Sequence, residues 1–184
     1  MRTITVALGE KTYNIEIAAG LLDQIGAKAR VLSQAVKAAI ISDSNVDPLY
    51  GERLERSLAA SGFEVTRIVF AAGEQSKNLT VLGQVYDELA RAGLTRSDLI
   101  LTLGGGVPGD LGGFAAATFL RGIDFIQVPT SLLAQIDSSV GGKVAIDLPS
   151  GKNLAGSFYQ PKAVFIDPDL LKTLPLRFLH DGLA

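Results

Sequence analysis

The chain has 184 residues, of which 47% are hydrophobic and 20% charged, and its formal net charge at pH 7 is −2. This composition fits one α/β domain with a sizeable core. The near balance of charge leaves no basic footprint for nucleic acid and no Lys/Arg block for a membrane surface. No run approaches the roughly 20 apolar residues of a membrane span, and the N-terminus lacks the apolar core of a signal peptide. We therefore expect a cytoplasmic protein.

Cysteine is absent, and His180 is the one histidine. The lack of cysteine excludes disulfides, thiolate metal sites and a cysteine nucleophile. A catalytic zinc site usually takes three protein ligands, with His the commonest among them. The chain is therefore expected to hold no zinc site of its own. A magnesium site made of carboxylates stays open, although no acidic cluster argues for one.

The period of the apolar residues changes repeatedly between that of strands and that of helices. Strand patterns cover residues 3–8, 12–17, 37–43, 63–70, 98–103 and 124–129. Helix patterns cover residues 20–34, 47–62, 78–91 and about 108–119. The first two strands predict a β-hairpin around Gly9. Repeated βα units with short turns then imply an α/β domain with a largely parallel sheet and helices on both faces.

Two further features concern element ends. Asp47 and Pro48 suit the start of a helix, with Asp47 as its cap and Pro48 at its first position, and Gly62 suits its end. Beyond residue 130 the pattern becomes irregular. After Pro175 a new helix begins and the sequence stops within it. We therefore expect a domain over residues 1–174, and in 175–184 the start of a second domain that continues beyond this chain. The alternative is a frayed natural terminus.

The clearest motif lies in LILTLGGGVPGDLGGF, residues 99–114. Gly104, Gly106 and Gly109 match G-x-G-x-x-G directly after a predicted strand and at the start of a predicted helix. Glycines there let the backbone approach a pyrophosphate, which the N–H groups and dipole of the helix N-terminus bind. Pro108 suits the first turn. The alternative is a tight strand–helix turn that needs glycine only for packing.

The motif departs from the ordinary dinucleotide fold, where it follows the first strand and a ribose-binding acid comes about 20 residues later. Here at least two βα units precede the glycines, and the next strand ends without an acid. An earlier strand ends in Asp43, with Asn45 beside it. Asp43 can bind a ribose or cap a turn. A P-loop fails, because Val144 and Asn153 follow the two Gly-Lys pairs where Ser or Thr is needed.

Polar residues also gather in the two segments 129–147 and 151–161. Lys143 and Lys152, in glycine-rich turns, can bind phosphates or carboxylates as compact cations, or can be solvated loop lysines. The segment GEQSKN, residues 73–78, fits both a helix-capping loop and a ligand-contacting one. Arg121 follows an apolar helix, where it would ordinarily be a surface charge.

Taken together, the segments GEQSK, GGGVPGD, ATFLRG, VPTSLLAQIDSSVGGK, GKNLAGSFYQP and LKTLP resemble the 3-dehydroquinate synthase family in order and spacing. The resemblance covers essentially the whole chain, and the DSSVGGK and GKN–FYQP segments are specific to this family and its sugar-phosphate cyclase relatives. It implies a Rossmann-like domain that binds NAD, about half of a longer chain with a helical C-terminal metal domain. Val144 and Asp147 stand where Thr and Asn are more usual.

The resemblance implies roles for particular residues. Asp137 and Lys143 would face the substrate, and Arg121 would reach the substrate phosphate of the neighbouring subunit, which implies a homodimer. Contacts to NAD are implied for Asp43, Asn45, Glu74, Lys77, Gly105, Gly106, Val107, Pro108, Gly109, Asp110, Thr130, Ser131, Lys143, Lys152, Asn153, Leu170, Leu171, Lys172 and Thr173.

The resemblance also implies the reaction and a division of labour. The full enzyme would convert 3-deoxy-arabino-heptulosonate 7-phosphate to 3-dehydroquinate and phosphate, by transient oxidation, phosphate elimination, reduction and an intramolecular aldol step. It belongs to the shikimate pathway of aromatic amino-acid biosynthesis. The metal, zinc or cobalt, would be held by a glutamate and two histidines beyond Ala184, so this chain would bind NAD without turnover. The alternatives are another sugar-phosphate cyclase, a polyol dehydrogenase, or a non-catalytic nucleotide-binding module.

Overall fold

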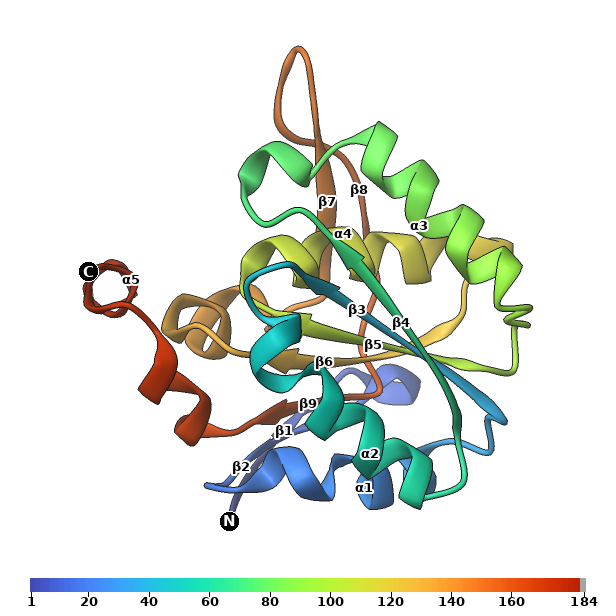
Figure 1. Ribbon diagram of the computed structural model, residues 1–184, viewed down its shortest axis with the longest axis vertical. Helices are drawn as coiled ribbons and strands as arrows, with labels where there is room; N and C mark the ends of the chain where they lie inside the picture. The colour runs from blue at the N-terminus through green and yellow to red at the C-terminus, as the bar shows by residue number, and fades with distance from the viewer. Residues whose placement is uncertain (183–184) are drawn as a thin grey trace.

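The computed structural model describes residues 1–182, without the side chains of residues 180 and 181. A seven-stranded sheet in the order β1-β2-β9-β6-β5-β3-β4 forms its centre (Figure 1). Only the β1–β2 pair of this sheet is antiparallel. The strands are β1 Arg2–Val6, β2 Tyr13–Ile17, β3 Lys37–Asp43, β4 Glu64–Phe70, β5 Leu99–Gly104, β6 Asp124–Pro129 and β9 Ala163–Ile166. The predicted parallel α/β sheet and N-terminal hairpin are confirmed.

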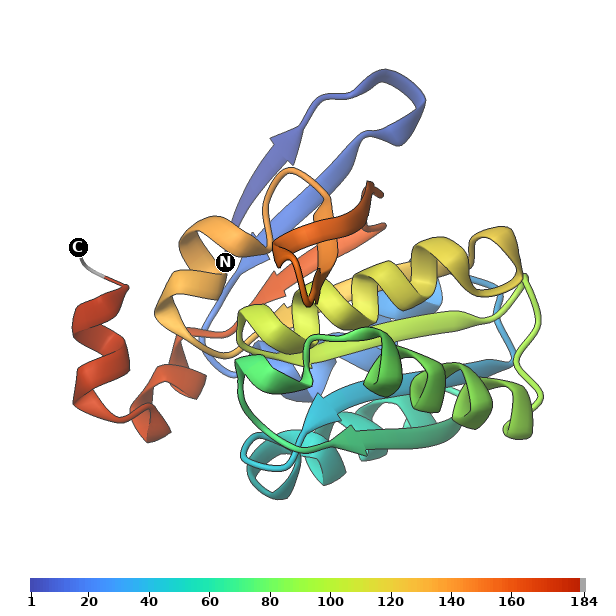
Figure 2. The same ribbon diagram turned by 90° about the horizontal axis from the view of Figure 1, so that it is seen from above.

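Helices cover both faces of the sheet, as Figures 1 and 2 show. The helices are α1 Ile25–Leu32, α2 Glu52–Ala60, α3 Leu79–Arg91, α4 Gly106–Thr118 and α5 Leu176–Asp181, with shorter helical turns η1 Gly9–Lys11, η2 Leu21–Gln24, η3 Asp47–Gly51, η4 Glu74–Ser76, η5 Phe119–Arg121, η6 Ala134–Ser138 and η7 Pro168–Thr173. Alternate residues of β3 face opposite sides: Ile40 packs in the core under α1 and α2, and Ile41 in the core under α3 and α4. No helix within residues 1–182 has the length and apolarity needed to cross a membrane.

A second, two-stranded antiparallel sheet lies over α4. It consists of β7 Lys143–Leu148 and β8 Gly151–Phe158, and its tip projects from the body of the molecule (Figure 1). Glycines let α4 pack closely on both sides. A Cβ on Gly112 would lie 2.6 Å from Thr102 Cγ2 of the sheet, and one on Gly113 would overlap Val144 of β7. The helix is therefore held between the sheet and the hairpin.

The sequence did not reveal β7, β8 or β9. β8 is half-exposed along its length and rich in glycine and polar residues, and β9 has only four residues. β9 is nonetheless central, because it pairs in parallel with both β2 and β6. The predicted Asp47 cap is wrong, since Asp47 lies inside η3 and makes no cap hydrogen bond. Asp43 instead caps the turn before η3, with Oδ1 accepting the N–H groups of Asn45 at 2.9 Å and Val46 at 3.0 Å.

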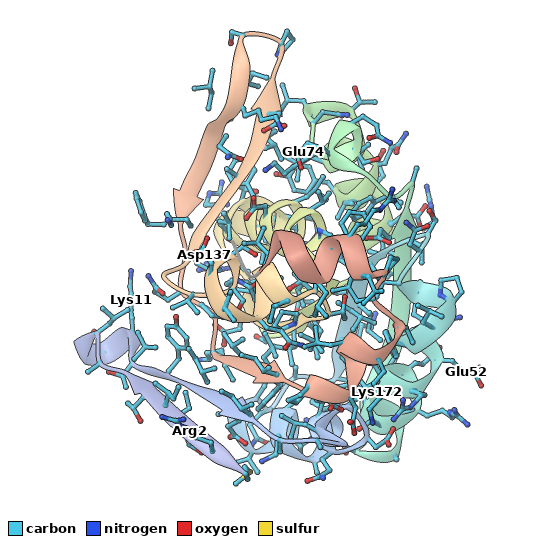
Figure 3. The ribbon with its side chains drawn as sticks, turned by 90° about the vertical axis from the view of Figure 1, so that its left-hand side faces the viewer. Arg2, Lys11, Glu52, Glu74, Asp137 and Lys172 are labelled. Atoms are coloured by element: carbon cyan, nitrogen blue, oxygen red, sulfur yellow. The ribbon has the colours of Figure 1, made fainter. Side chains whose placement is uncertain are left out.

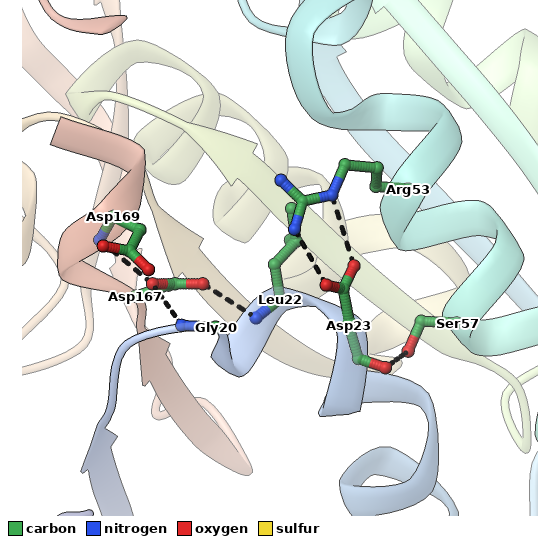
Figure 4. Close-up of polar contacts among 7 residues, drawn as sticks. All are labelled: Gly20, Leu22, Asp23, Arg53, Ser57, Asp167 and Asp169. Atoms are coloured by element: carbon green, nitrogen blue, oxygen red, sulfur yellow. Dashed lines mark hydrogen bonds and ion pairs between the residues drawn. The ribbon is translucent and has the colours of Figure 1, made fainter. Parts of the chain in front are cut away.

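A buried carboxylate joins the N-terminal segment to the end of β9. Asp167 is 1% exposed and accepts hydrogen bonds from the N–H groups of Gly20 at 3.1 Å, Leu22 at 3.0 Å and Asp169 at 3.0 Å (Figure 4). Figure 4 also shows Asp23 paired with Arg53 of α2. These contacts fix the start of η2 against both the sheet and α2, although the two segments are far apart in sequence.

Replacing each of two helical glycines by alanine should have opposite effects on the free energy of unfolding. Gly26 of α1 lies against the backbone of α2, and a Cβ there would overlap the Ser57 carbonyl oxygen. Around Gly83 of α3 nothing lies within 4 Å of an added Cβ. We expect Gly26→Ala to lower the free energy of unfolding by about 2 kcal/mol or more, and Gly83→Ala to raise it by about 0.5 to 1 kcal/mol. Urea denaturation checks both, and a neutral Gly26→Ala would contradict the close α1–α2 contact.

Candidate functional site

A cleft of about 490 Å³ lies where the carboxyl ends of β3, β5 and β6 meet. In open parallel sheets, ligands bind outside these ends of the strands. The cleft gathers predicted residues from four separate parts of the chain. Its lining includes Asp43, Asn45, Gly105, Gly106, Val107, Pro108, Thr130, Ser131 and Thr173.

The glycine loop places the N-terminus of α4 at the cleft. Gly104 has φ +155, and Gly105 precedes α4 with no side-chain cap. A Cβ on Gly105 would come within 3.3 Å of Ser131 Oγ. As the first residues of the helix, Gly106 and Val107 have N–H groups without an intrahelical partner. Bare N–H groups at the positive end of a helix dipole bind phosphates.

Asp43 both caps a turn and lines the cleft. It is 8% exposed and lines the cleft. Its Oδ1 caps the turn after β3 through the N–H groups of Asn45 and Val46. Within the described residues its Oδ2 takes part in no hydrogen bond. The two roles that the sequence left open, capping and ligand binding, are therefore compatible in one carboxylate.

Beside the cleft, a buried lysine collects acidic side chains from three elements. Lys77 is 4% exposed, and its Nζ lies 3.0 Å from Asp110 Oδ2 and 2.6 Å from Asn153 Oδ1. Glu74 Oε1 lies at 3.6 Å and Asp147 Oδ1 at 3.9 Å. Asp147 also accepts the N–H of Asn153 at 2.8 Å. This cluster joins η4, α4 and the β7–β8 hairpin.

The surroundings shift the pKa of both main partners. Burial lowers the pKa of the Lys77 ammonium, but its hydrogen bond to Asp110 and the negative charges around it outweigh burial, so this pKa lies above its ordinary value. Burial raises the pKa of the Asp110 carboxyl, and contact with Lys77 offsets that effect only in part. Lys77 is therefore a permanent cation at neutral pH.

A second cavity of about 470 Å³ lies under the hairpin and contains the predicted substrate residues. Asp137 and Lys143 line it together with Asp110 and Asn153. The last two also contact Lys77, so the Lys77 cluster borders this cavity. In the view of Figure 3, Asp137 and Glu74 lie in the same half of the molecule as the β7–β8 hairpin.

The remaining predicted residues are more scattered. Lys152 is exposed, with Nζ 3.3 Å from Glu74 Oε1. Leu170 is 1% exposed in the hydrophobic core, and Lys172 pairs on the surface with Asp169 at 2.7 Å. Figure 3 places Lys172 far from Glu74. Gly109 and Leu171 are not among the residues that line the cleft. Of the 170–173 stretch, Thr173 alone lines it, so the cofactor roles of the others stay predictions.

Arg121 lies apart from these residues. Gly105 stands at one end of α4 and Arg121 beyond the other, and the 13 residues of this helix make about 20 Å. An arginine side chain cannot span that length. The structure therefore does not bring Arg121 to the cleft of its own chain.

Sequence reasoning missed the apolar wall of the cleft. This wall is made of Val46, Leu49, Tyr50, Leu133, Leu174 and Phe178. The sequence did contain a signal for Val46, Leu49 and Tyr50, because they closely follow the predicted strand that ends in the candidate ligand residue Asp43. Leu133 and Leu174 lie where the sequence has no clear period, and Phe178 lies in the short helix predicted after Pro175. Within residues 1–182 no three His, Cys, Asp or Glu side chains are grouped as a metal site requires.

The sequence matches a family model, described as 3-dehydroquinate synthase N-terminal, over residues 67–181. Among curated proteins, 3-dehydroquinate synthase from Clostridium acetobutylicum is 58% identical over 184 residues, which are 100% of this chain and 52% of that protein. The enzyme of the same name from Clostridium botulinum is 55% identical, and the match covers 100% of this chain and 53% of that protein. The chain thus spans about half the length of the curated relatives it matches.

Solved structures with the same fold include sugar-phosphate cyclases. A 2-deoxy-scyllo-inosose synthase complexed with carbaglucose-6-phosphate, NAD+ and Co2+ is 30% identical with a TM-score of 0.91, covering 99% of this chain and 50% of that chain. The 2-epi-5-epi-valiolone synthase of Streptomyces hygroscopicus, with NAD+ and Zn2+ bound, is 32% identical with a TM-score of 0.84. The match covers 97% of this chain and 49% of that chain. The glycerol dehydrogenase of Schizosaccharomyces pombe, 24% identical with a TM-score of 0.73, shares the fold alone.

The sequence motifs, the two cavities and these matches agree. The match to the family model extends over more than half of the residues, from 67 to 181. The chain belongs to the 3-dehydroquinate synthase N-terminal family.

Proposed function

We propose that this chain is the NAD-binding part of a 3-dehydroquinate synthase. Joined to the C-terminal half that its relatives carry, it would convert 3-deoxy-arabino-heptulosonate 7-phosphate to 3-dehydroquinate and phosphate. The single observation that supports this most is the cleft that joins Asp43 to the bare N-terminus of α4. Alone, the chain would bind NAD without turnover.

The residues present fit NAD. The free N–H groups of Gly106 and Val107 suit the pyrophosphate, and the open Oδ2 of Asp43 suits a ribose hydroxyl. The apolar wall, with Leu49 and Leu133, suits a flat ring. Gly105 and Gly106 carry no side chain, so at these two positions the backbone itself lines the cleft.

The chain's own residues divide the remaining work. NAD, when bound, supplies the reversible oxidation of one substrate hydroxyl and is returned unchanged after each turnover. Lys143 would bind an anionic group of the substrate, and Asp137 would accept a hydrogen bond from a hydroxyl. Lys77 would hold Asp110 and Asn153 at the border between cofactor and substrate. The hairpin above them would keep water from the reacting atoms.

The described residues do not fit a metal ion, since the three carboxylates near Lys77 converge on an ammonium group. We assign the zinc or cobalt site to the C-terminal half, and we place the boundary between the two domains at residue 174. Glu74, Lys152, Leu171 and Lys172 would meet NAD only when that half closes over the cleft, whereas Leu170 would act through the core beneath it.

Arg121 supports a homodimer. It stands at the far end of α4 from its own cleft, on the exposed surface. An exposed arginine binds phosphate well, and a second copy of the chain could bring its Arg121 to this subunit's substrate cavity. The partner in this proposal is thus another copy of the same protein.

Asp43 variants separate cofactor binding from stability. Asp43→Asn keeps an Oδ1 that can cap the Asn45–Val46 turn but loses the charge toward the cleft. We expect its Kd for NAD to rise about 10- to 100-fold, with the free energy of unfolding nearly unchanged. Asp43→Ala loses the cap as well and should be destabilised by about 1 kcal/mol. Asp87→Asn, on the exposed face of α3, is the control, and an unchanged Kd in Asp43→Asn would exclude this carboxylate as a cofactor contact.

Assembly tests the division between the two halves. The chain alone, with NAD and zinc, should release no phosphate from the heptulosonate phosphate. Adding the C-terminal half of a relative, or joining the two in one polypeptide, should restore phosphate release with no net NADH. The measurement follows phosphate and absorbance at 340 nm in the same sample.

Other results would identify the rivals. Phosphate release by the chain alone would contradict the assigned place of the metal site. Bulk NADH from a polyol would indicate a dehydrogenase, and turnover of a different sugar phosphate would indicate another cyclase.

A further inference from the structure

The segment that carries Arg121 has an unusual backbone. Leu120, Arg121 and Gly122 have φ values of 51, 67 and 121 in succession. Residues with a side chain rarely adopt positive φ, and two in a row need support from the surrounding structure. We call this segment, residues 119–123, the Arg121 corner.

Hydrogen bonds at residues 122 and 123 hold the end of the Arg121 corner. Two are within the corner and its helix: Gly122 N–H donates to the Phe119 carbonyl at 3.0 Å, and Ile123 N–H to Ala116 at 2.9 Å. The third comes from outside, where the Tyr159 hydroxyl donates to the Ile123 carbonyl at 3.0 Å. A Cβ on Gly122 would lie 3.3 Å from this hydroxyl, so the contact is close.

Tyr159 is itself well fixed. Its ring stacks on that of Phe125 in β6, with centroids 5.6 Å apart and planes 14° from parallel. Burial and then the charge of Asp124 raise the pKa of its hydroxyl, although Arg96 acts in the opposite direction. The hydroxyl therefore stays protonated at neutral pH and donates a hydrogen bond.

The backbone of the same residue holds a second turn. Tyr159 N–H donates to the Gly142 carbonyl at 2.8 Å, and the neighbouring Gln160 Nε2 donates to Gly141 at 3.2 Å. Gly141 and Gly142 have φ values of 91 and 67 and directly precede Lys143. Tyr159 therefore binds the backbone of two segments, one that carries Arg121 and one that precedes Lys143.

We propose that Tyr159 is a positioning residue that fixes the Arg121 corner relative to the turn that carries Lys143. The hydroxyl of Tyr159 holds the Arg121 corner, and its backbone N–H holds the turn before Lys143. One residue would therefore determine the separation of Arg121 and Lys143, the two cations proposed to bind substrate. This role rests on the proposed function, which places Lys143 in this subunit's cavity and Arg121 at that of its neighbour. Displacement of Tyr159 would then affect both sites of a dimer.

Tyr159→Phe tests the proposal, because it removes the hydroxyl and keeps the stacked ring and the N–H. Amide hydrogen exchange on the 184-residue chain, followed by mass spectrometry, should show residues 119–123 exchanging about fivefold faster. Residues 104–110, in the glycine loop, should exchange as before. An unchanged rate at 119–123, or an equal acceleration in both segments, would overturn the proposal.

Tyr50→Phe is the matched control. Tyr50 also donates its hydroxyl to a backbone carbonyl, that of Leu170 in η7 at 3.0 Å, and contacts the Thr173 hydroxyl at 2.5 Å, but it packs under the opposite face of the sheet. This variant should accelerate exchange in residues 168–173 and leave residues 119–123 unchanged. Acceleration at 119–123 in both variants would show a general loosening and count against a specific role for Tyr159.

Kinetics of the enzyme assembled with its C-terminal half supply a second readout. Tyr159→Phe should raise KM for the phosphorylated substrate about fivefold, with kcat and the Kd for NAD unchanged. A lower kcat with unchanged KM would contradict the positioning role. If the assembled wild-type enzyme fails to act on this substrate, the proposed function fails, whereas the exchange experiment still decides whether Tyr159 fixes the Arg121 corner.

Discussion

The close packing of α4 between the sheet and the β7–β8 hairpin is the constraint on which the rest of the site depends. Gly112 and Gly113 allow it, because even one methyl group at either position would meet Thr102 or Val144. With the helix so close, its N-terminus opens into the cleft at the ends of β3, β5 and β6, and Asp110 in its second turn reaches Lys77. Small side chains here replace the bulky core residues of an ordinary helix, so the backbone itself becomes part of the binding surface.

Electrostatics then join the two cavities. A buried ammonium group such as Lys77 is costly unless it is paired and hydrogen-bonded, and here Asp110 and Asn153 provide those contacts from two different elements. Since both partners also line the second cavity, any ligand that moves them acts on Lys77 as well. One cation thus holds together two side chains that line the second cavity. The contacts of Asp147 and Asn153 with Lys77 also tie the tip of the hairpin to the body of the domain.

Much of the fold could be predicted from the sequence, and the reasons for success and failure are physical. The runs at 37–43 and 124–129 match β3 and β6 residue for residue, because strands buried on both faces are continuously apolar. β9 pairs through four residues only, and β8 leaves its side chains half-exposed, so neither has a readable period. Within the site, the glycines and Asp43 were found from their chemistry. The clustering around Lys77 was not, since contacts between residues 77, 110 and 153 depend on the tertiary fold. The strained corner at Arg121 likewise has no signature in the sequence.

The most direct test of the central claim is a calorimetric titration of the purified 184-residue chain with NAD, and a separate titration with ATP as the control nucleotide. If the cleft above α4 is a preformed cofactor site, NAD binds with saturation at one molecule per chain and ATP does not. Equal binding of NAD and ATP would mean that the glycine loop is only a general phosphate site. No binding of either would contradict the account, because the cleft would then be a packing feature of the turn and not a cofactor site of this domain.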